Sequence, residues 1–75
     1  MNEQVRLLKI AAGAYSFRRP NLWCSVRHEG RGFASWRLRV QVRSDDGLWS
    51  QPLRYGFDSY ADCVRRVSAL AQVIS

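Results

Sequence analysis

One segment limits the fold of this chain more than any other. Between Ser35 and Arg43, apolar and polar side chains alternate without a break. The apolar positions are Trp36, Leu38, Val40 and Val42, and the polar positions are Arg37, Arg39, Gln41 and Arg43. A period of two places successive side chains on opposite faces of a β-sheet. The segment therefore predicts a strand with one face in the core and an arginine-rich face turned away from it.

The preceding segment, Leu22 to His28, predicts a neighbouring strand with the same kind of alternation. Its core-facing positions are Leu22, Cys24 and Val26, which leaves Trp23, Ser25 and Arg27 on the opposite face. The segment Glu29–Gly32 follows and contains glycine at two positions, so it predicts the turn between the two strands.

A third strand is expected after Ser44–Gly47, a turn cluster in which glycine supplies the positive φ that closes a hairpin. This strand runs from about Leu48 to Phe57. Its core parity is shared by Trp49, Leu53, Tyr55 and Phe57, so Trp49 joins Trp36 among the expected core residues. Pro52 has no N–H for the ladder, which predicts an edge strand or a bulge.

The last part of the chain predicts an amphipathic helix. Ser59 suits the N-cap position, and Asp62 three residues later forms a variant of the capping box. An apolar stripe at helical spacing contains Tyr60, Cys63, Val64, Val67, Leu70, Ala71 and Ile74. The opposite side is expected to carry Arg65, Arg66, Ser68 and Gln72.

Residues 1–15 fit two different structures. Asn2 can cap a helix that ends at Ala12, with Gly13 as the residue after its C-cap. The other interpretation, which we prefer, is an extra strand through Val5, Leu7 and Leu8. In either case the segment 18–21, Arg-Arg-Pro-Asn, is expected to be a loop.

With 75 residues, the chain has room for a single domain, because separate cores need more chain than this. We divide it into residues 1–21, an N-terminal strand or short helix plus a basic loop, residues 22–57, an antiparallel sheet, and residues 58–75, the helix. The predicted fold is α+β: an antiparallel sheet of three to four strands packed on one C-terminal helix. No export signal opens the chain and no apolar run approaches a membrane span, so we expect a cytoplasmic protein that does not bind a membrane.

Charge points to an anionic partner. Twelve lysine and arginine residues stand against six acidic ones, a formal net charge of +6, and all of the basic residues except Lys9 are arginine. A guanidinium group binds phosphate or carboxylate through two parallel hydrogen bonds. A genome rich in G and C also favours arginine codons, so composition alone leaves both explanations open.

We expect no catalysis, no cofactor and no metal. The single histidine, His28, stands at a strand end without a local nucleophile or carboxylate at a familiar spacing. Asp45 and Asp46 lie in a turn, where such side chains usually hydrogen-bond the local backbone. Cys24 and Cys63 lack paired metal-ligand spacing and fall on the predicted core faces.

The candidate site is the basic face of the predicted sheet. Alternate side chains of the central strand lie about 6.8 Å apart, and arginines from both neighbouring strands join them. Trp23 shares the parity of Arg27 and is placed to stack on a base or a sugar. The candidate binding residues are Trp23, Arg27, Arg31, Arg37, Arg39, Arg43 and Arg54. A merely solvated face is the alternative, but the outward positions of the central strand include no acidic residue.

Several motifs from Ser25 onward form a familiar series: Ser25-Val26-Arg27, then Trp36, then the acid–glycine turn, then Tyr55-Gly56-Phe57-Asp58-Ser59 at a helix start. This series resembles the plant ethylene-response-factor DNA-binding domain and looks like the arm-site-binding domain of phage-type integrases. The resemblance covers about residues 25–75. It departs at Ala34-Ser35-Trp36, where the plant pattern has glycine, lysine and tryptophan, and at Arg54, where it has tryptophan.

The resemblance implies a three-stranded sheet, backed by one helix, that lies in the DNA major groove. It also implies that Arg27 contacts DNA and that Arg39 and Arg54 face the groove. We therefore expect a small basic module that binds duplex DNA. The main alternative is an inhibitor or adaptor, encoded by a phage or mobile element, that docks on an acidic protein surface. A homodimer formed by pairing of an exposed sheet edge is compatible with both.

Overall fold

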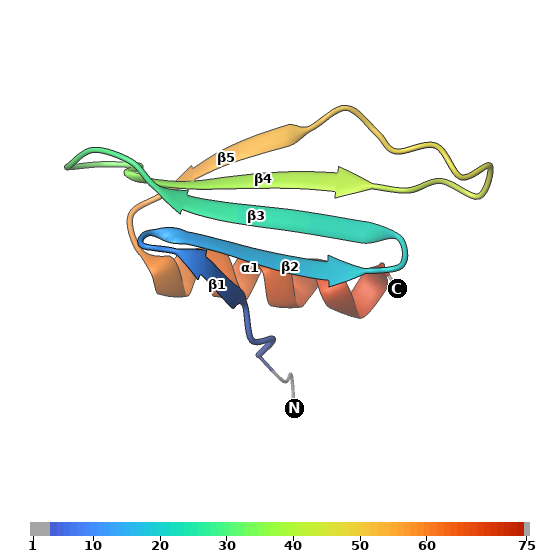
Figure 1. The fold of residues 1–75 in the computed structure, drawn as a ribbon, viewed down its shortest axis with the longest axis horizontal. Coiled ribbons are helices and arrows are strands. Elements are labelled where there is room, and N and C mark those ends of the chain that lie inside the picture. The colour runs from blue at the N-terminus through green and yellow to red at the C-terminus, as the bar shows by residue number, and fades with distance from the viewer. Residues whose placement is uncertain (1–3, 75) are drawn as a thin grey trace.

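The computed structural model describes residues 4–74, and these form one antiparallel sheet with a helix against one of its faces (Figure 1). The elements are β1 (Leu8–Ala11), β2 (Ala14–Arg19), β3 (Leu22–His28), β4 (Trp36–Val42), β5 (Leu53–Phe57) and α1 (Tyr60–Val73). Each strand pairs with the next one along the chain, in the order β1-β2-β3-β4-β5. The predicted α+β architecture is confirmed, and the sheet has five strands where three or four were expected.

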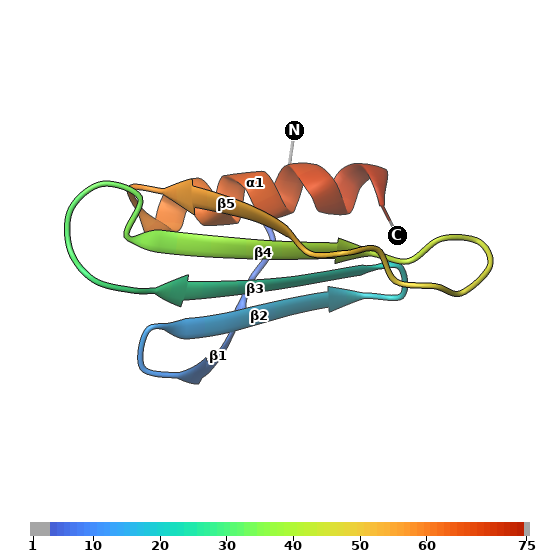
Figure 2. The same ribbon diagram turned by 90° about the horizontal axis from the view of Figure 1, so that it is seen from above.

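The core lies between the sheet and α1, which packs against β3, β4 and β5 (Figure 2). Across the β3–β4 ladder, Leu22 faces Val42, Cys24 faces Val40 and Val26 faces Leu38. Directly opposed residues share a face of the sheet, so these pairs form one apolar surface. The helix covers it with Cys63, Val64 and Val67, all of them buried. The strand predicted from Leu22 to His28 is confirmed with these bounds. The strand predicted from Ser35 to Arg43 is observed from Trp36 to Val42, and both strands have the predicted facing.

The helix begins as its sequence predicts, with one exception in facing. Ser59 is the N-cap, and its hydroxyl accepts a hydrogen bond of 3.2 Å from the Asp62 N–H. Ser68, expected on the outer side, is instead buried. Its hydroxyl accepts a 3.0 Å hydrogen bond from the N–H of Val5. The N-terminal segment thus covers the side of the helix that the sequence pattern leaves to solvent.

The N-terminal region corrects two predictions. A helix over residues 2–12 is wrong for its described part, residues 4–12, and Asn2 itself lies outside the described residues. The preferred strand exists but begins at Leu8, whereas Leu7 is buried just before it. The expected basic loop is also wrong, because Arg18 and Arg19 end β2, opposite Trp23 and Leu22. Only Pro20 and Asn21 form the turn.

The connection from β4 to β5 corrects the facing of Trp49. The predicted turn is present, with the Gly47 N–H donating to the Ser44 carbonyl at 2.9 Å. The edge strand β5 starts at Leu53, directly after Pro52, so the predicted start at about Leu48 is wrong. Trp49, however, is 43 % exposed and pairs with Arg43. Leu53 pairs with Val40, so the register slips by one residue between the two pairs. A slip of one residue reverses the facing of a side chain, which moves Trp49 from the core side to the side of Arg43.

Candidate nucleic-acid interface

The face of the sheet that points away from α1 is polar and basic, and we call it the outer face. The strand registers assign its residues: Ser16 and Arg18 from β2, Trp23, Ser25 and Arg27 from β3, Arg37, Arg39 and Gln41 from β4, and Arg54 and Gly56 from β5. They alternate along each strand with the residues that face the helix. The alternation that builds the core therefore also gathers these side chains on one surface.

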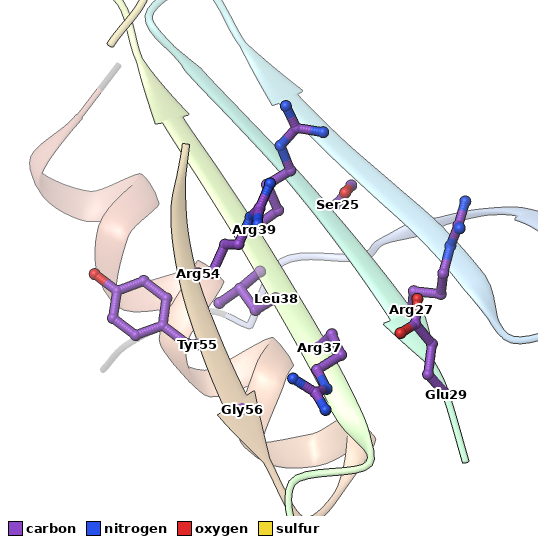
Figure 3. Close-up of a pocket in the computed structure, with 9 residues that line it drawn as sticks. All are labelled: Ser25, Arg27, Glu29, Arg37, Leu38, Arg39, Arg54, Tyr55 and Gly56. Atoms are coloured by element: carbon purple, nitrogen blue, oxygen red, sulfur yellow. The ribbon is translucent and has the colours of Figure 1, made fainter. Parts of the chain in front are cut away.

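Four arginines meet on this face in two directly opposed pairs. Arg27 on β3 faces Arg37 on β4, and Arg39 on β4 faces Arg54 on β5. The Cβ atoms of opposed residues lie about 5 Å apart, and like charges in this position destabilise a sheet. The four side chains line a hollow of about 470 Å³ together with Ser25 and Glu29. Figure 3 shows these side chains and the strands from which they come.

Three of the acidic residues, Asp46, Asp58 and Asp62, are engaged away from this cluster. Asp62 forms an ion pair with Arg65 on the helix, the only ion pair within residues 4–74. Asp58 accepts a 2.8 Å hydrogen bond from the Ala34 N–H, and Asp46 accepts hydrogen bonds from the Ser44 hydroxyl and the Leu48 N–H. The Ser44 hydrogen bond is the main reason that the pKa of Asp46 lies below its usual value. Glu29, at one end of the hollow, is the acidic side chain that borders it.

Aromatic side chains adjoin the arginines on the outer face. Trp23 is 38 % exposed, and the guanidinium carbon of Arg18 lies 4.8 Å from the centre of its ring. Trp23 also lines a small hollow with Ser25, Arg39 and Gln41. Trp49 shares this face through its pairing with Arg43. The outer face therefore combines guanidinium groups with exposed rings, the two kinds of group that bind phosphates and stack on bases.

Not all predicted site residues meet at the hollow. Arg27, Arg37, Arg39 and Arg54 line it, and Trp23 lies beside it. Arg43 lies beyond the end of β4, where its Nε donates a 3.3 Å hydrogen bond to the Gly47 carbonyl. Arg31 is exposed in the loop between β3 and β4 and does not line the hollow.

Two residues of this face were missed by the sequence analysis. Arg18 was assigned to a loop because the dipeptide Arg-Arg precedes Pro-Asn. The usable signal was the alternation of Tyr15 and Phe17 with Ser16 and Arg18 between two turns. Trp49 was assigned to the core, and the register slip between Trp49 and Leu53 reverses that assignment. Pro52 favours an irregularity in this strand, but the sequence does not show at which residue it occurs.

Other reactive groups of the chain serve the fold. His28 stacks on Trp36, with ring centres 4.4 Å apart and planes at 15°. Cys24 and Cys63 are buried free thiols, and burial raises the pKa of each to about 11. Residues 4–74 contain no group of three or more histidine, cysteine or acidic side chains placed to hold a metal ion. The helix in that range is not long and apolar enough to cross a membrane.

The resemblance to the ethylene-response-factor and integrase arm-site domains stays a prediction. Within the larger sheet, β3, β4, β5 and α1 are three antiparallel strands backed by one helix, while β1 and β2 extend the sheet on the β3 side. Comparison of the chain with protein-family models, curated proteins and solved structures gave no match in any of the three. Only the geometry and charge of the outer face therefore point to a function.

Proposed function

We propose that this protein binds nucleic acid, and duplex DNA in particular, through the outer face of its sheet. The observation that carries the proposal is the cluster of Arg27, Arg37, Arg39 and Arg54, none of which is ion-paired within residues 4–74. Four neighbouring cations repel one another in the free protein. Phosphates relieve that repulsion, and counterions released from the DNA add a favourable entropy.

The dimensions of the sheet suggest how a duplex is engaged. Neighbouring strands lie about 4.8 Å apart, so β3, β4 and β5 together span roughly 10 Å, within the ~12 Å width of the major groove. All five strands span roughly 19 Å and are too wide to enter. The four arginines lie on the three strands at the β5 edge. In this arrangement β2 lies over the sugar-phosphate backbone beside the groove, and Arg18 contacts a phosphate there.

Docking on an acidic protein surface is the competing hypothesis, since arginine binds carboxylates as well as phosphates. The outer face favours nucleic acid because exposed rings adjoin the arginines, and every base offers a face on which a ring can stack. The two hypotheses also differ in salt response. Duplex DNA gives a linear dependence of log K on log salt concentration, with a slope of about −0.9 per neutralised phosphate.

Fluorescence anisotropy tests the proposal, with labelled duplex DNA, single-stranded DNA and duplex RNA titrated at several sodium chloride concentrations. With four phosphate contacts, we expect a slope of about −3 to −4 for duplex DNA. The Arg37→Ala/Arg39→Ala variant should lose about two contacts, which makes the slope shallower by about 1.8.

The control is Arg6→Ala/Arg65→Ala, which removes the same charge from residues outside the outer face. Arg65 lies on α1, and Arg6 follows Val5, which is hydrogen-bonded to the helix. This variant should keep the parent slope. The proposal fails if the parent does not bind any of the three nucleic acids at low salt. It fails equally if both double variants lose the same affinity, because net charge alone then explains the binding.

A further inference from the structure

The loop between β3 and β4 exposes an aromatic side chain almost completely. Phe33 is 93 % exposed, more than any other large apolar residue in residues 4–74. Phenylalanine is among the residues that proteins bury most often. In this loop the Phe33 ring lowers solubility, and it gains no stabilisation from packing within the described residues.

Two hydrogen bonds fix this loop, one between its two ends and one at Ala34, the residue after Phe33. The Glu29 N–H donates to the Ser35 carbonyl at 2.7 Å, and the Ala34 N–H donates to the Asp58 carboxylate at 2.8 Å. Ala34 has φ 56, a left-handed conformation that is unfavourable for a residue with a Cβ atom. Its Cβ fits against β5 only because residue 56 is glycine. The backbone next to Phe33 is thus fixed, and the Phe33 side chain lies exposed beside it.

The same anchors place the loop at the rim of the arginine hollow. Glu29, at the start of the loop, and Gly56, against which Ala34 packs, both line that hollow. Arg31 adds a further exposed cation to the loop. The loop that carries Phe33 therefore borders the end of the outer face at which Arg27 faces Arg37.

We propose that Phe33 is a base-contacting residue, which inserts at a base step of the duplex bound by the outer face. The inference rests on the proposed function and adds to it a contact with bases that phosphate binding does not require. Proteins that bind the minor groove insert single apolar side chains between base pairs, which unstacks the step and kinks the duplex. We expect Phe33 to act on a base step in the same way from the edge of the major groove. Such insertion favours sequences with easily unstacked steps, such as TA and CA/TG.

The test uses short duplexes that contain 2-aminopurine, a base whose fluorescence rises when it is unstacked. The parent protein should raise this fluorescence, and Phe33→Ala should bind without raising it. Loss of one stacking contact should weaken binding about 5- to 100-fold. The slope of log K against log salt should stay at the parent value, because Phe33 neutralises no phosphate. Phe33→Leu keeps an apolar wedge and should retain part of the signal.

Val73→Ala is the matched control, since Val73 is 79 % exposed but lies on α1, on the other side of the sheet. It should match the parent in affinity and in fluorescence. The inference is overturned if Phe33→Ala keeps both the parent affinity and the rise in fluorescence while Arg37→Ala/Arg39→Ala loses binding. That result leaves the proposed function intact. If the parent itself binds no nucleic acid, the proposed function fails and this inference fails with it.

Discussion

Gly56 and Ala34 meet where the loop after β3 lies against β5. A Cβ atom added to Gly56 would lie 2.8 Å from the Ala34 Cβ, closer than two carbon atoms can pack. We expect Gly56→Ala to destabilise the protein by about 1–3 kcal/mol, measured by urea unfolding. Adding Ala34→Gly should restore most of that loss, because it removes the clashing atom and relieves the positive φ of residue 34. A stable Gly56→Ala protein would show that the loop does not pack here.

The two buried thiols make stability depend on alkaline pH. Burial raises the pKa of Cys24 and of Cys63 from 9.0 to about 11, and it also raises the pKa of Tyr60. Between pH 9 and pH 11 the thiols of the unfolded chain lose their protons, whereas the buried thiols of the folded chain keep them. Stability is therefore complete below about pH 9 and falls as the pH rises towards 11, by up to about 2–3 kcal/mol per thiol.

Urea unfolding at a series of pH values measures this effect. Cys24→Ala should lose less stability than the parent over the same interval, since one of the titrating thiols is absent. Equal losses in the two proteins would mean that the Cys24 thiol ionises as readily in the folded state as in the unfolded chain.

At the scale of elements, the N-terminal segment is attached to the helix through Ser68. Its hydroxyl accepts the Val5 N–H at 3.0 Å. Ser68→Ala leaves that partly buried N–H without its acceptor, so we expect a loss of about 0.5–1.5 kcal/mol. The amides of Val5 and of β1 should exchange with solvent faster, while those of β3 and β4 change little. Uniform acceleration across the whole sheet would contradict this account, because it would mean that the segment is part of the central cooperative unit.

Elements with strong periodicity were predictable from sequence. β3, β4 and α1 were predicted with nearly their observed bounds because Leu22, Cys24 and Val26 alternate cleanly and because Ser59 is a good N-cap. β2 was missed because two arginines before Pro20 have the composition of a loop. Their place in a strand depends on pairing with Trp23 and Leu22, which is a tertiary effect. The same reason explains Ser68, whose burial depends on a segment distant in sequence.

The site residues that could be predicted from sequence are those whose strands were predicted. Arg27, Arg37, Arg39 and Arg54 follow from parity alone, and the structure places them together. Arg43 has the right parity but lies past the end of β4, and Arg18 was missed together with its strand. Phe33 has no periodic neighbours, so its exposure follows only from the conformation of the loop.

At the scale of the whole molecule, the charge of the outer face lowers the stability of the fold. The opposed pairs Arg27–Arg37 and Arg39–Arg54 repel each other in the free protein. We expect Arg37→Gln/Arg39→Gln to raise stability at low salt by about 0.5–1 kcal/mol, measured by thermal unfolding. Added salt should stabilise the parent more than this variant, because salt screens the repulsion. A variant less stable than the parent would mean that these arginines support the fold.

Nuclear magnetic resonance of the arginine side chains shows directly whether the outer face binds DNA. Each guanidinium Nε–Hε group gives its own signal, and single Arg→Lys variants assign it. On titration with duplex DNA, we expect shifts for Arg27, Arg37, Arg39 and Arg54 and none for the helix residues Arg65 and Arg66. Shifts confined to the helix arginines, or no shift for any of the four outer-face arginines at saturation, would contradict it.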